Sequence, residues 1–103
     1  MVMSRYEKGR AREYRAMIIL RDQGWYVARS AASHGPVDLF AAKKGRILLI
    51  QVKSGSARVR RGDLEQLIEW GRNFDCDVEV WHFKGRGVIQ KRRIHRGSRE
   101  SLP

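Results

Sequence analysis

Apolar residues recur along the chain at two different spacings, which separate predicted helices from predicted strands. Over residues 4–23 the spacing is helical, and Gly24 follows as a stop signal. This stripe consists of Tyr6, Tyr14, Met17, Ile18 and Leu20. A second helical stripe ends at Phe74, and Gly62 or Asp63 is placed to cap its start. Both segments are therefore predicted to be amphipathic helices.

Five shorter segments show the alternation or the short apolar runs that are typical of strands. They are residues 25–31, 37–43, 46–54, 77–83 and 88–94, with turn residues between them. The order of helix, three strands, helix and two strands predicts one α/β domain over residues 1–103, with a sheet of about five strands flanked by helices. The polar residues 95–103 are expected to form a flexible tail.

The charge balance narrows the choice of partner. Lys and Arg number 22 against 11 Asp and Glu, giving a formal charge of +11 and a pI near 10.9, which favours a polyanion. No apolar run approaches the roughly 18 residues of a membrane span, and the first residues lack the apolar region of a signal peptide. We therefore expect a soluble intracellular protein. The single cysteine, Cys76, excludes an internal disulfide and a zinc finger, and is expected to be a small buried residue.

Residues 35–54, GPVDLFAAKKGRILLIQVKS, carry polar residues where a plain apolar hairpin would have none. A two-residue turn at Lys44–Gly45 would place Asp38 opposite Gln51, with Lys53 on the same face. The opposite face would then hold Val37, Leu39, Leu48, Ile50 and Val52. A three-residue loop without a bulge would instead place Asp38 opposite Ile50 and separate the three polar side chains.

Glu13 lies within or beside the buried stripe of the first predicted helix. A carboxylate in that position should either pair with an arginine or bind a metal, and the spacing alone leaves both open. An oxygen cluster with a nearby lysine suits metal-assisted cleavage of a phosphodiester, in which Mg²⁺ takes few carboxylates and a lysine orients water or offsets charge. Asp38, Gln51 and Lys53 match this need in type.

The same hairpin resembles the PD-(D/E)xK nuclease motif, with PVD as its first part and QVK as its second. More narrowly, the stretch from KGRAREYR to VRRGDLEQLIEW, roughly residues 8–84, is similar to the archaeal-type Holliday junction resolvases. This resemblance implies a restriction-endonuclease-like core with a mixed sheet. It also implies a homodimer that nicks four-way DNA junctions symmetrically with Mg²⁺, for which Mn²⁺ can substitute.

The resemblance assigns roles to individual positions. Glu13 matches the glutamate of the first helix, Asp38 the metal-binding aspartate and Lys53 the motif lysine, while Ser33 matches a serine of the loop before the motif. Gln51 departs from the glutamate that is usual in the resolvases, although Mrr-like restriction enzymes have a QxK motif and Glu13 could supply the missing charge. The predicted catalytic residues are Glu13, Ser33, Asp38, Gln51 and Lys53, and the predicted metal ligands are Glu13, Asp38, Gln51 and Val52.

Basic residues cluster near the N-terminus, in the loop after Lys53 and at Lys91–Arg93. Contact with phosphates is the preferred interpretation, and the absence of a predicted base-reading element favours recognition of DNA shape. The predicted DNA-binding residues are Arg5, Lys8, Arg10, Arg29, His34, Arg58, Arg60 and Arg61. His82 is expected to pack in the sheet and His95 to belong to the tail.

Trp70 and Trp81 do not both fit the predicted core, so at least one indole is expected to meet a partner such as a second copy of the chain. The resemblance in the first helix and in VRRGDLEQLIEW favours a junction-resolving endonuclease. The alternatives are a restriction-like or nicking endonuclease that acts on duplex DNA, and a non-catalytic protein that binds branched DNA, against which Glu13, Asp38 and Lys53 argue. An inactive relative also remains open because of Gln51. The expected location is the cytoplasm of an archaeal cell, or of the host cell if the sequence is viral.

Overall fold

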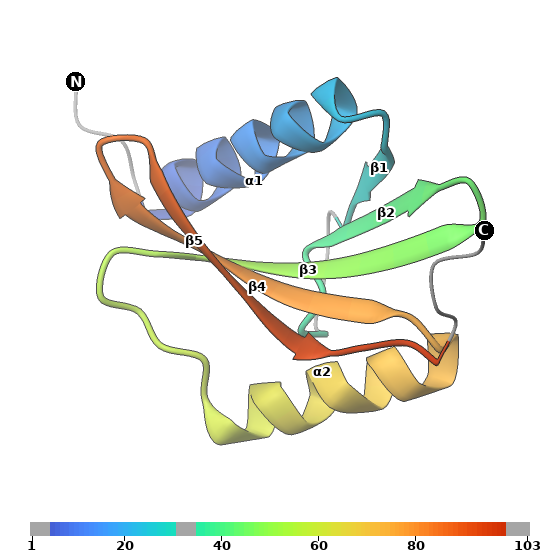
Figure 1. Ribbon diagram of the computed structural model, residues 1–103. Helices are drawn as coiled ribbons and strands as arrows, with labels where there is room; N and C mark the ends of the chain where they lie inside the picture. The colour runs from blue at the N-terminus through green and yellow to red at the C-terminus, as the bar shows by residue number, and fades with distance from the viewer. Residues whose placement is uncertain (1–4, 31–34, 99–103) are drawn as a thin grey trace.

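Two helices pack against one five-stranded sheet in the computed structural model, which describes residues 5–30 and 35–98 (Figure 1). The helices are α1, Arg5–Asp22, and α2, Arg61–Phe74. The strands are β1 (Tyr26–Arg29), β2 (Leu39–Lys43), β3 (Arg46–Ser54), β4 (Asp77–Gly85) and β5 (Val88–His95). The predicted element order and the α/β class are confirmed.

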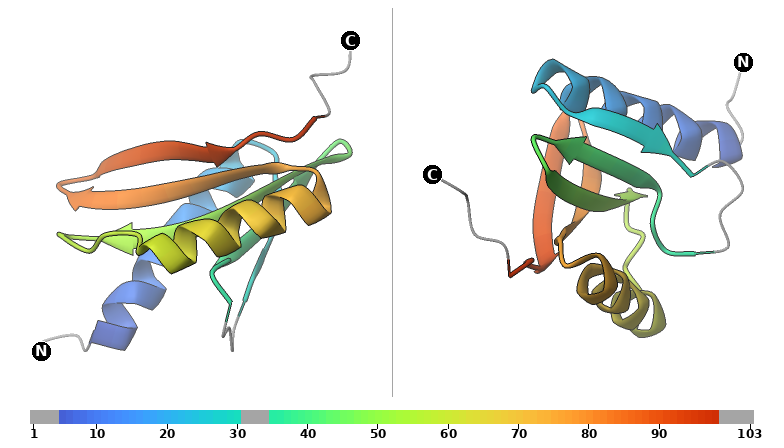
Figure 2. Two further views of the ribbon diagram at one scale, coloured as in Figure 1. Left: turned by 90° about the horizontal axis from the view of Figure 1, so that it is seen from below. Right: turned by 90° about the vertical axis from the view of Figure 1, so that its right-hand side faces the viewer.

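The strands lie in the order β1-β2-β3-β4-β5. Only β3 and β4 are parallel, and the other neighbouring pairs are antiparallel, so the sheet is mixed as predicted. A parallel pair needs a crossover connection, and α2 supplies it. Figure 2 shows α1 on one face of the sheet and α2 on the other. Within the described ranges, neither helix combines the length and apolarity that crossing a membrane requires.

The core has two parts because consecutive residues of a strand face opposite sides of the sheet. Leu48 and Ile50 of β3 pack under α1, whereas Leu49, between them, packs under α2. The α1 side also holds Ala16, Met17, Leu20, Leu39, Ala41, Trp81 and Phe83, and the α2 side holds Val37, Leu67, Cys76, Val78 and Val80. Cys76 is buried as predicted, and burial raises the pKa of its thiol to about 11.

The β2–β3 hairpin has the predicted two-residue turn. Lys44 and Gly45 have φ values of 50° and 79°, and the ladder pairs Lys43 with Arg46. The ladder ends, however, at the pair Leu39 and Ile50. Beyond it the Asp38 N–H donates to the Ile50 carbonyl at 2.9 Å, one residue away from the extrapolated partner Gln51.

This break changes the face of the residue before Asp38. Val37 was predicted to share a face with Leu39, but it packs under α2 while Leu39 packs under α1. A one-residue change of register moves side chains to the other face of a sheet, and the hydrogen bond of Asp38 with Ile50 is such a change. The regular pairing of β2 with β3 therefore ends at Leu39, directly after Asp38 in the chain.

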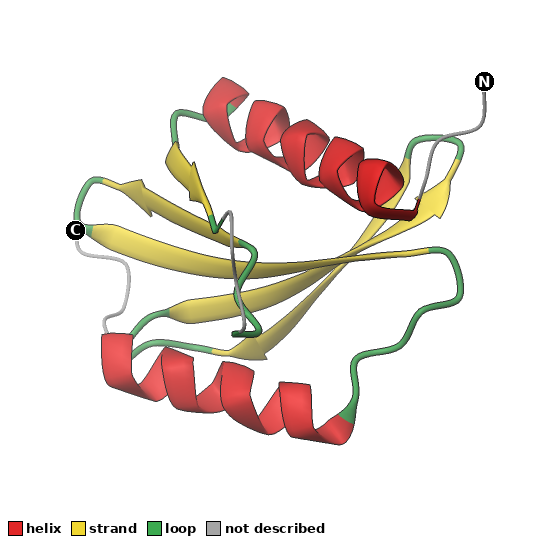
Figure 3. Cartoon of the chain, turned by 180° about the vertical axis from the view of Figure 1, so that it is seen from behind, coloured by secondary structure: helices red, strands yellow, loops and turns green. Residues whose placement is uncertain are grey.

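The predicted start of the second helix is wrong. The helix α2 begins at Arg61 and its N-cap is Arg60, which makes no side-chain capping bond, so neither Gly62 nor Asp63 caps it. Asp63 lies instead in the first turn, where the partial positive charge of the helix terminus favours a carboxylate. Figure 3 shows the long loop that carries the chain from β3 to this helix.

The predicted flexible tail is wrong for residues 95–98. His95 is the last residue of β5, and its Nδ1 lies 3.0 Å from the Cys76 carbonyl oxygen. Two backbone groups that follow are also held, because the N–H of Gly97 donates to Asp77 and that of Ser98 donates to Asp75. Hydrogen bonds to two aspartate side chains, at the end of α2 and the start of β4, therefore order this segment.

Gly71 of α2 packs closely against β4 and β5, so a larger residue at this position is expected to lower the stability of the fold. A Cβ on Gly71 would lie 2.6 Å from Nδ1 of His95 and 2.8 Å from Cγ2 of Val78. We expect Gly71→Ala to lower the free energy of unfolding by about 1–3 kcal/mol, because the added methyl displaces both side chains. Gly62→Ala is the matched control, since nothing lies within 4 Å of its Cβ position in the same helix. Thermal unfolding measures both, and an equal midpoint for the two variants would contradict the expected overpacking.

Candidate active site

Asp38 lies where β2 enters the sheet, with its carboxylate against the backbone of β3. Its Oδ2 accepts a hydrogen bond from the Val52 N–H at 2.7 Å. Burial raises the pKa of Asp38 to about 6, and the negative charge of Glu13 adds to this effect, whereas the Val52 N–H and the charge of Lys53 oppose it. A carboxylate whose charge is disfavoured by burial gains from a bound cation.

Gln51 is the buried polar residue of the site. It is 5% exposed, and its Nε2 donates to the Pro36 carbonyl at 3.1 Å. Its Oε1 is buried and finds no partner among the described residues. A buried polar atom without a partner costs free energy, so this oxygen suits a ligand that accepts a lone pair. The bond to Pro36 decides which end of the amide remains available.

Glu13 reaches the site from α1. Its Oε1 lies 3.2 Å from Nη1 of Arg29, and both side chains are largely buried, with exposed fractions of 20% and 18%. The Arg29 guanidinium also lies over the Tyr14 ring, 5.2 Å from its centre. Of the two alternatives for Glu13, the ion pair with an arginine is present. Arg29 was predicted to bind DNA, and its guanidinium is here engaged by Glu13.

Lys53 completes the described part of the site. It is two residues beyond Gln51 on β3 and therefore shares its face, as predicted. Its charge lowers the pKa of Asp38, so the two groups interact electrostatically. Ser33 and His34 lie outside the described residues.

The site is poor in negative charge. No group of three or more His, Cys, Asp or Glu side chains converges on a common point in residues 5–30 and 35–98. The charges of Glu13 and Asp38 are formally balanced by those of Arg29 and Lys53. The oxygens of Asp38 and the amide oxygen of Gln51, which has no partner among the described residues, are nevertheless of the hard type that Mg²⁺ takes. The residues therefore fit a divalent cation, with fewer charged ligands than a site with glutamate at position 51.

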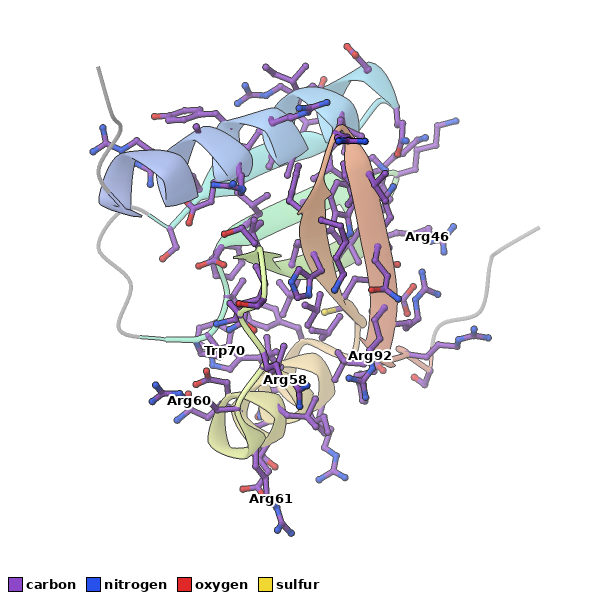
Figure 4. All side chains as sticks on the ribbon, turned by 90° about the vertical axis from the view of Figure 1, so that its left-hand side faces the viewer. Arg46, Arg58, Arg60, Arg61, Trp70 and Arg92 are labelled. Carbon is purple, nitrogen blue, oxygen red and sulfur yellow. The ribbon has the colours of Figure 1, made fainter. Side chains whose placement is uncertain are left out.

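The basic residues predicted to bind DNA are spread over several elements. Arg58, Arg60 and Arg61 surround the start of α2, and Figure 4 shows them projecting from the loop and the first turn. Arg61 lies 3.5 Å from Glu65 in an exposed ion pair, which contributes little to stability. Arg10 is exposed on α1. The side chains of Arg5 and Lys8, although in α1, lie outside what the structure describes.

A basic groove on the α2 side of β4 and β5 was not predicted from the sequence. Its basic lining includes Arg58, His82, Lys84 and Arg92. The signal was present in the alternation of β4, which places Val80, His82 and Lys84 on one face. The sequence does not, however, specify which residues of β3 and β5 flank these side chains. The strand pairing does, because it places Lys53 and Gln90 on either side of His82.

The two tryptophans in question have different surroundings. Trp81 is 1% exposed, so the structure places it in this chain's own core, where Lys91 covers its ring at 4.1 Å. Trp70 is half-buried between Phe40 and Phe74, with ring centres 5.9 Å and 5.8 Å away. Because Phe74 is 46% exposed, this aromatic group leaves an apolar surface on α2.

Comparison with known proteins places this geometry in a family. The model of the archaeal Holliday junction resolvase (Hjc) family matches residues 4–99. The crossover junction endodeoxyribonuclease Hjc of Methanocaldococcus jannaschii is 36% identical over 73 residues, which are 68% of this chain and 54% of that protein. This chain thus spans about half the length of that curated relative. The structure of Archaeoglobus fulgidus Hjc, a Holliday junction resolvase, matches with a TM-score of 0.74 and 23% identity over 84% of this chain and 73% of that one. The fold is therefore shared.

Proposed function

Because the chain belongs to the archaeal Holliday junction resolvase family, we propose that it is a metal-dependent endonuclease that nicks four-way DNA junctions symmetrically. The observation that carries the proposal is the buried Oε1 of Gln51, which has no partner among the described residues and lies one residue before Val52, the hydrogen-bond partner of Asp38. A protein that only binds DNA gains nothing from two carboxylates in the path of a polyanion. A metal-assisted hydrolase needs such oxygens.

The proposed cofactor is Mg²⁺, with Mn²⁺ as a substitute. Asp38 and Gln51 would hold it through side-chain oxygens, and Glu13 and the carbonyl of Val52 are the further predicted ligands. When bound, the ion would polarise the scissile phosphate and lower the pKa of the attacking water. Lys53 would orient that water or offset the charge that develops on the phosphate. Ser33 keeps its predicted catalytic role as part of this proposal.

The ion pair of Arg29 with Glu13 gives both residues a role in this proposal. Arg29 holds the glutamate close enough for its charge to act on Asp38. The pair also leaves the site with no net formal charge, which eases the approach of a phosphate. Arg10, Arg58, Arg60 and Arg61, with Arg5, Lys8 and His34, are the proposed phosphate contacts.

The proposed assembly is a homodimer, since symmetric nicking requires two sites related by a two-fold axis. The exposed aromatic surface of Trp70 and Phe74 on α2 supports a self-association that would remove apolar area from water. A DNA substrate also supports a location inside the cell.

A labelled four-way junction and a linear duplex of the same arm sequence test this function. We expect paired nicks in the junction, complete dependence on Mg²⁺, and no comparable cleavage of the duplex. Binding of both substrates, measured in the same mixtures, is the control for substrate quality. Equal cleavage of both substrates would favour a restriction-like nuclease instead, and junction binding without cleavage at any Mg²⁺ or Mn²⁺ concentration would favour a non-catalytic protein.

A further inference from the structure

A groove of about 500 Å³ lies on the α2 side of the sheet, between the loop after β3 and the strands β4 and β5. Its polar lining comes from Arg58 in the loop, His82 and Lys84 on β4, and Gln90, Lys91 and Arg92 on β5. Apolar residues, among them Val59 and Val80, complete it. None of the residues that line this groove is an aspartate or a glutamate.

The groove continues the candidate active site across the sheet. In the parallel ladder Lys53 pairs with His82, and in the antiparallel ladder His82 pairs with Gln90. Paired residues of neighbouring strands share a face, so the row Lys53, His82, Gln90 runs from the site into the groove. Neighbouring strands are about 4.8 Å apart, so this row spans about 10 Å.

The cations of the groove are available to a ligand. Arg58, Lys84 and Arg92 are exposed, and none of them forms an ion pair with a carboxylate of the described residues. The neighbouring Arg93, in contrast, lies 3.2 Å from Asp77 and 2.7 Å from Glu79 and is neutralised by them. Adjacent arginines of β5 thus differ in their partners, and the one without a carboxylate partner belongs to the groove.

The wall of the groove is held in place by His82. Its Nε2 lies 2.7 Å from the Gly55 carbonyl oxygen, where the loop leaves β3. This contact fixes the start of the loop against β4, and Arg58 follows three residues later. Figure 4 shows Arg58 and Arg92 close together on this side of the molecule, with Arg46 further away.

We propose that this groove binds the phosphodiester backbone of the DNA strand that passes through the active site. The proposal rests on the proposed function for its choice of ligand, and it extends the proposed phosphate contacts from Arg58 to Lys84 and Arg92 across the groove. Measured along the axis of a duplex, with a rise of about 3.4 Å per nucleotide, the span of about 10 Å corresponds to about three nucleotides. Exposed cations without intervening acids suit a polyanion, and the direct row from Lys53 favours the strand undergoing cleavage over an acidic protein.

The test compares two double variants that remove the same charge. Arg58→Ala/Arg92→Ala removes two cations from the groove, whereas Arg21→Ala/Arg46→Ala removes two exposed arginines that do not line it. Binding to a junction and to a duplex is measured in EDTA at several salt concentrations. We expect the groove variant to lose about tenfold or more in affinity and to flatten the log-log salt slope by about 1 to 4 units, with less than about a twofold loss for the control. Equal losses of affinity for the two double variants would mean that the net charge of the protein, and not the groove, determines binding. That result would overturn the proposal.

Two further measurements locate the strand and the ligand class. A neutral methylphosphonate placed about three nucleotides from the nick should weaken wild-type binding and leave the groove variant unaffected, because the contact is already lost. Weakening of both proteins alike would contradict the proposed path. If polyglutamate bound the groove and DNA affinity did not change in the double variant, the partner would be an acidic protein.

Circular dichroism and thermal unfolding establish that both doubles are folded, and Arg58→Lys/Arg92→Lys should restore most of the affinity. These binding experiments do not require cleavage, so they separate the groove from the proposed reaction. Junction cleavage could fail while the groove is confirmed. Unchanged junction binding by the groove variant would reject the groove alone, whether or not the wild type cleaves the junction.

Discussion

Replacing Asp38 by asparagine is expected to abolish metal-dependent cleavage while leaving junction binding within a few-fold of the wild type. The change removes a charged metal ligand, and it preserves an oxygen that can accept the Val52 N–H. Binding should persist because the substitution removes a negative charge from the DNA-facing surface. Cleavage and binding are measured on the same labelled junction in Mg²⁺ and in EDTA.

The same variant should be more stable than the wild type when no metal is present. Burial raises the pKa of Asp38 from 3.8 to about 6, so the folded state opposes its ionisation. Above pH 6 this opposition costs about 1–2 kcal/mol once partial exposure is allowed for, and asparagine avoids the cost. The folded pKa is the higher one, so the wild type loses stability as pH rises from 3.8 to about 6.

Thermal unfolding in EDTA should therefore show a higher midpoint for Asp38→Asn at pH 7.5 and no difference below pH 3.8. Asp22→Asn, at an exposed position at the end of α1, is the matched control and should show neither effect. Cleavage retained by a purified Asp38→Asn variant would remove Asp38 from the catalytic site. A lower midpoint at pH 7.5 would show that its charge is well solvated.

Replacing Gln51 by glutamate should destabilise the metal-free protein and tighten its binding of Mn²⁺. The Nε2 of Gln51 donates to the Pro36 carbonyl, and a carboxylate would place an acceptor against an acceptor. Leaving that carbonyl unpaired and burying a charge should cost about 1–3 kcal/mol. A second negative ligand beside a divalent cation should improve Mn²⁺ affinity by about tenfold or more.

Because of these opposing effects, we expect bound metal to restore the stability that Gln51→Glu loses in its metal-free state. Thermal unfolding should show a lower midpoint for Gln51→Glu in EDTA and a larger rise with Mn²⁺ than the wild type shows, while calorimetry gives the affinity. Cleavage at low Mg²⁺ should be kept or raised. Gln66→Glu makes the same chemical change at an exposed position of α2 and should alter neither quantity.

Gln51→Met completes the comparison, because it removes both the oxygen and the donor at similar size. We expect it to lose the metal-induced rise in midpoint. An unchanged rise in this variant would mean that the unpaired Oε1 is not a ligand. A large loss of cleavage in Gln51→Glu, with tight metal binding, would show that the reaction requires the neutral amide.

The local sequence was sufficient to predict the order of helices and strands and the types of residue that could form a metal-dependent site. The helical stripe ending before Gly24 and the alternation of β4 predict structure from spacing alone, since each depends on residues close together in the chain. The left-handed turn at Lys44–Gly45 also follows from local conformational preference and sets the pairing of β2 with β3. Local spacing therefore places Gln51 and Lys53 on one face, whereas the position of Asp38 does not follow from it, because the ladder ends before Asp38.

Tertiary structure decided which partners those side chains have. The break in the ladder at Asp38, the ion pair of Glu13 with Arg29 and the hydrogen bond of Gln51 with Pro36 join residues 12 to 16 positions apart, and no local spacing specifies them. The burial of Trp81 and the groove beside His82 depend on how β4 pairs with β3 and β5. Within a regular strand or helix, sequence spacing determines which face a side chain occupies. The packing of distant elements determines where that regularity ends, and whether the face holds a solvated charge, a buried ion pair or a buried oxygen with no partner among the described residues.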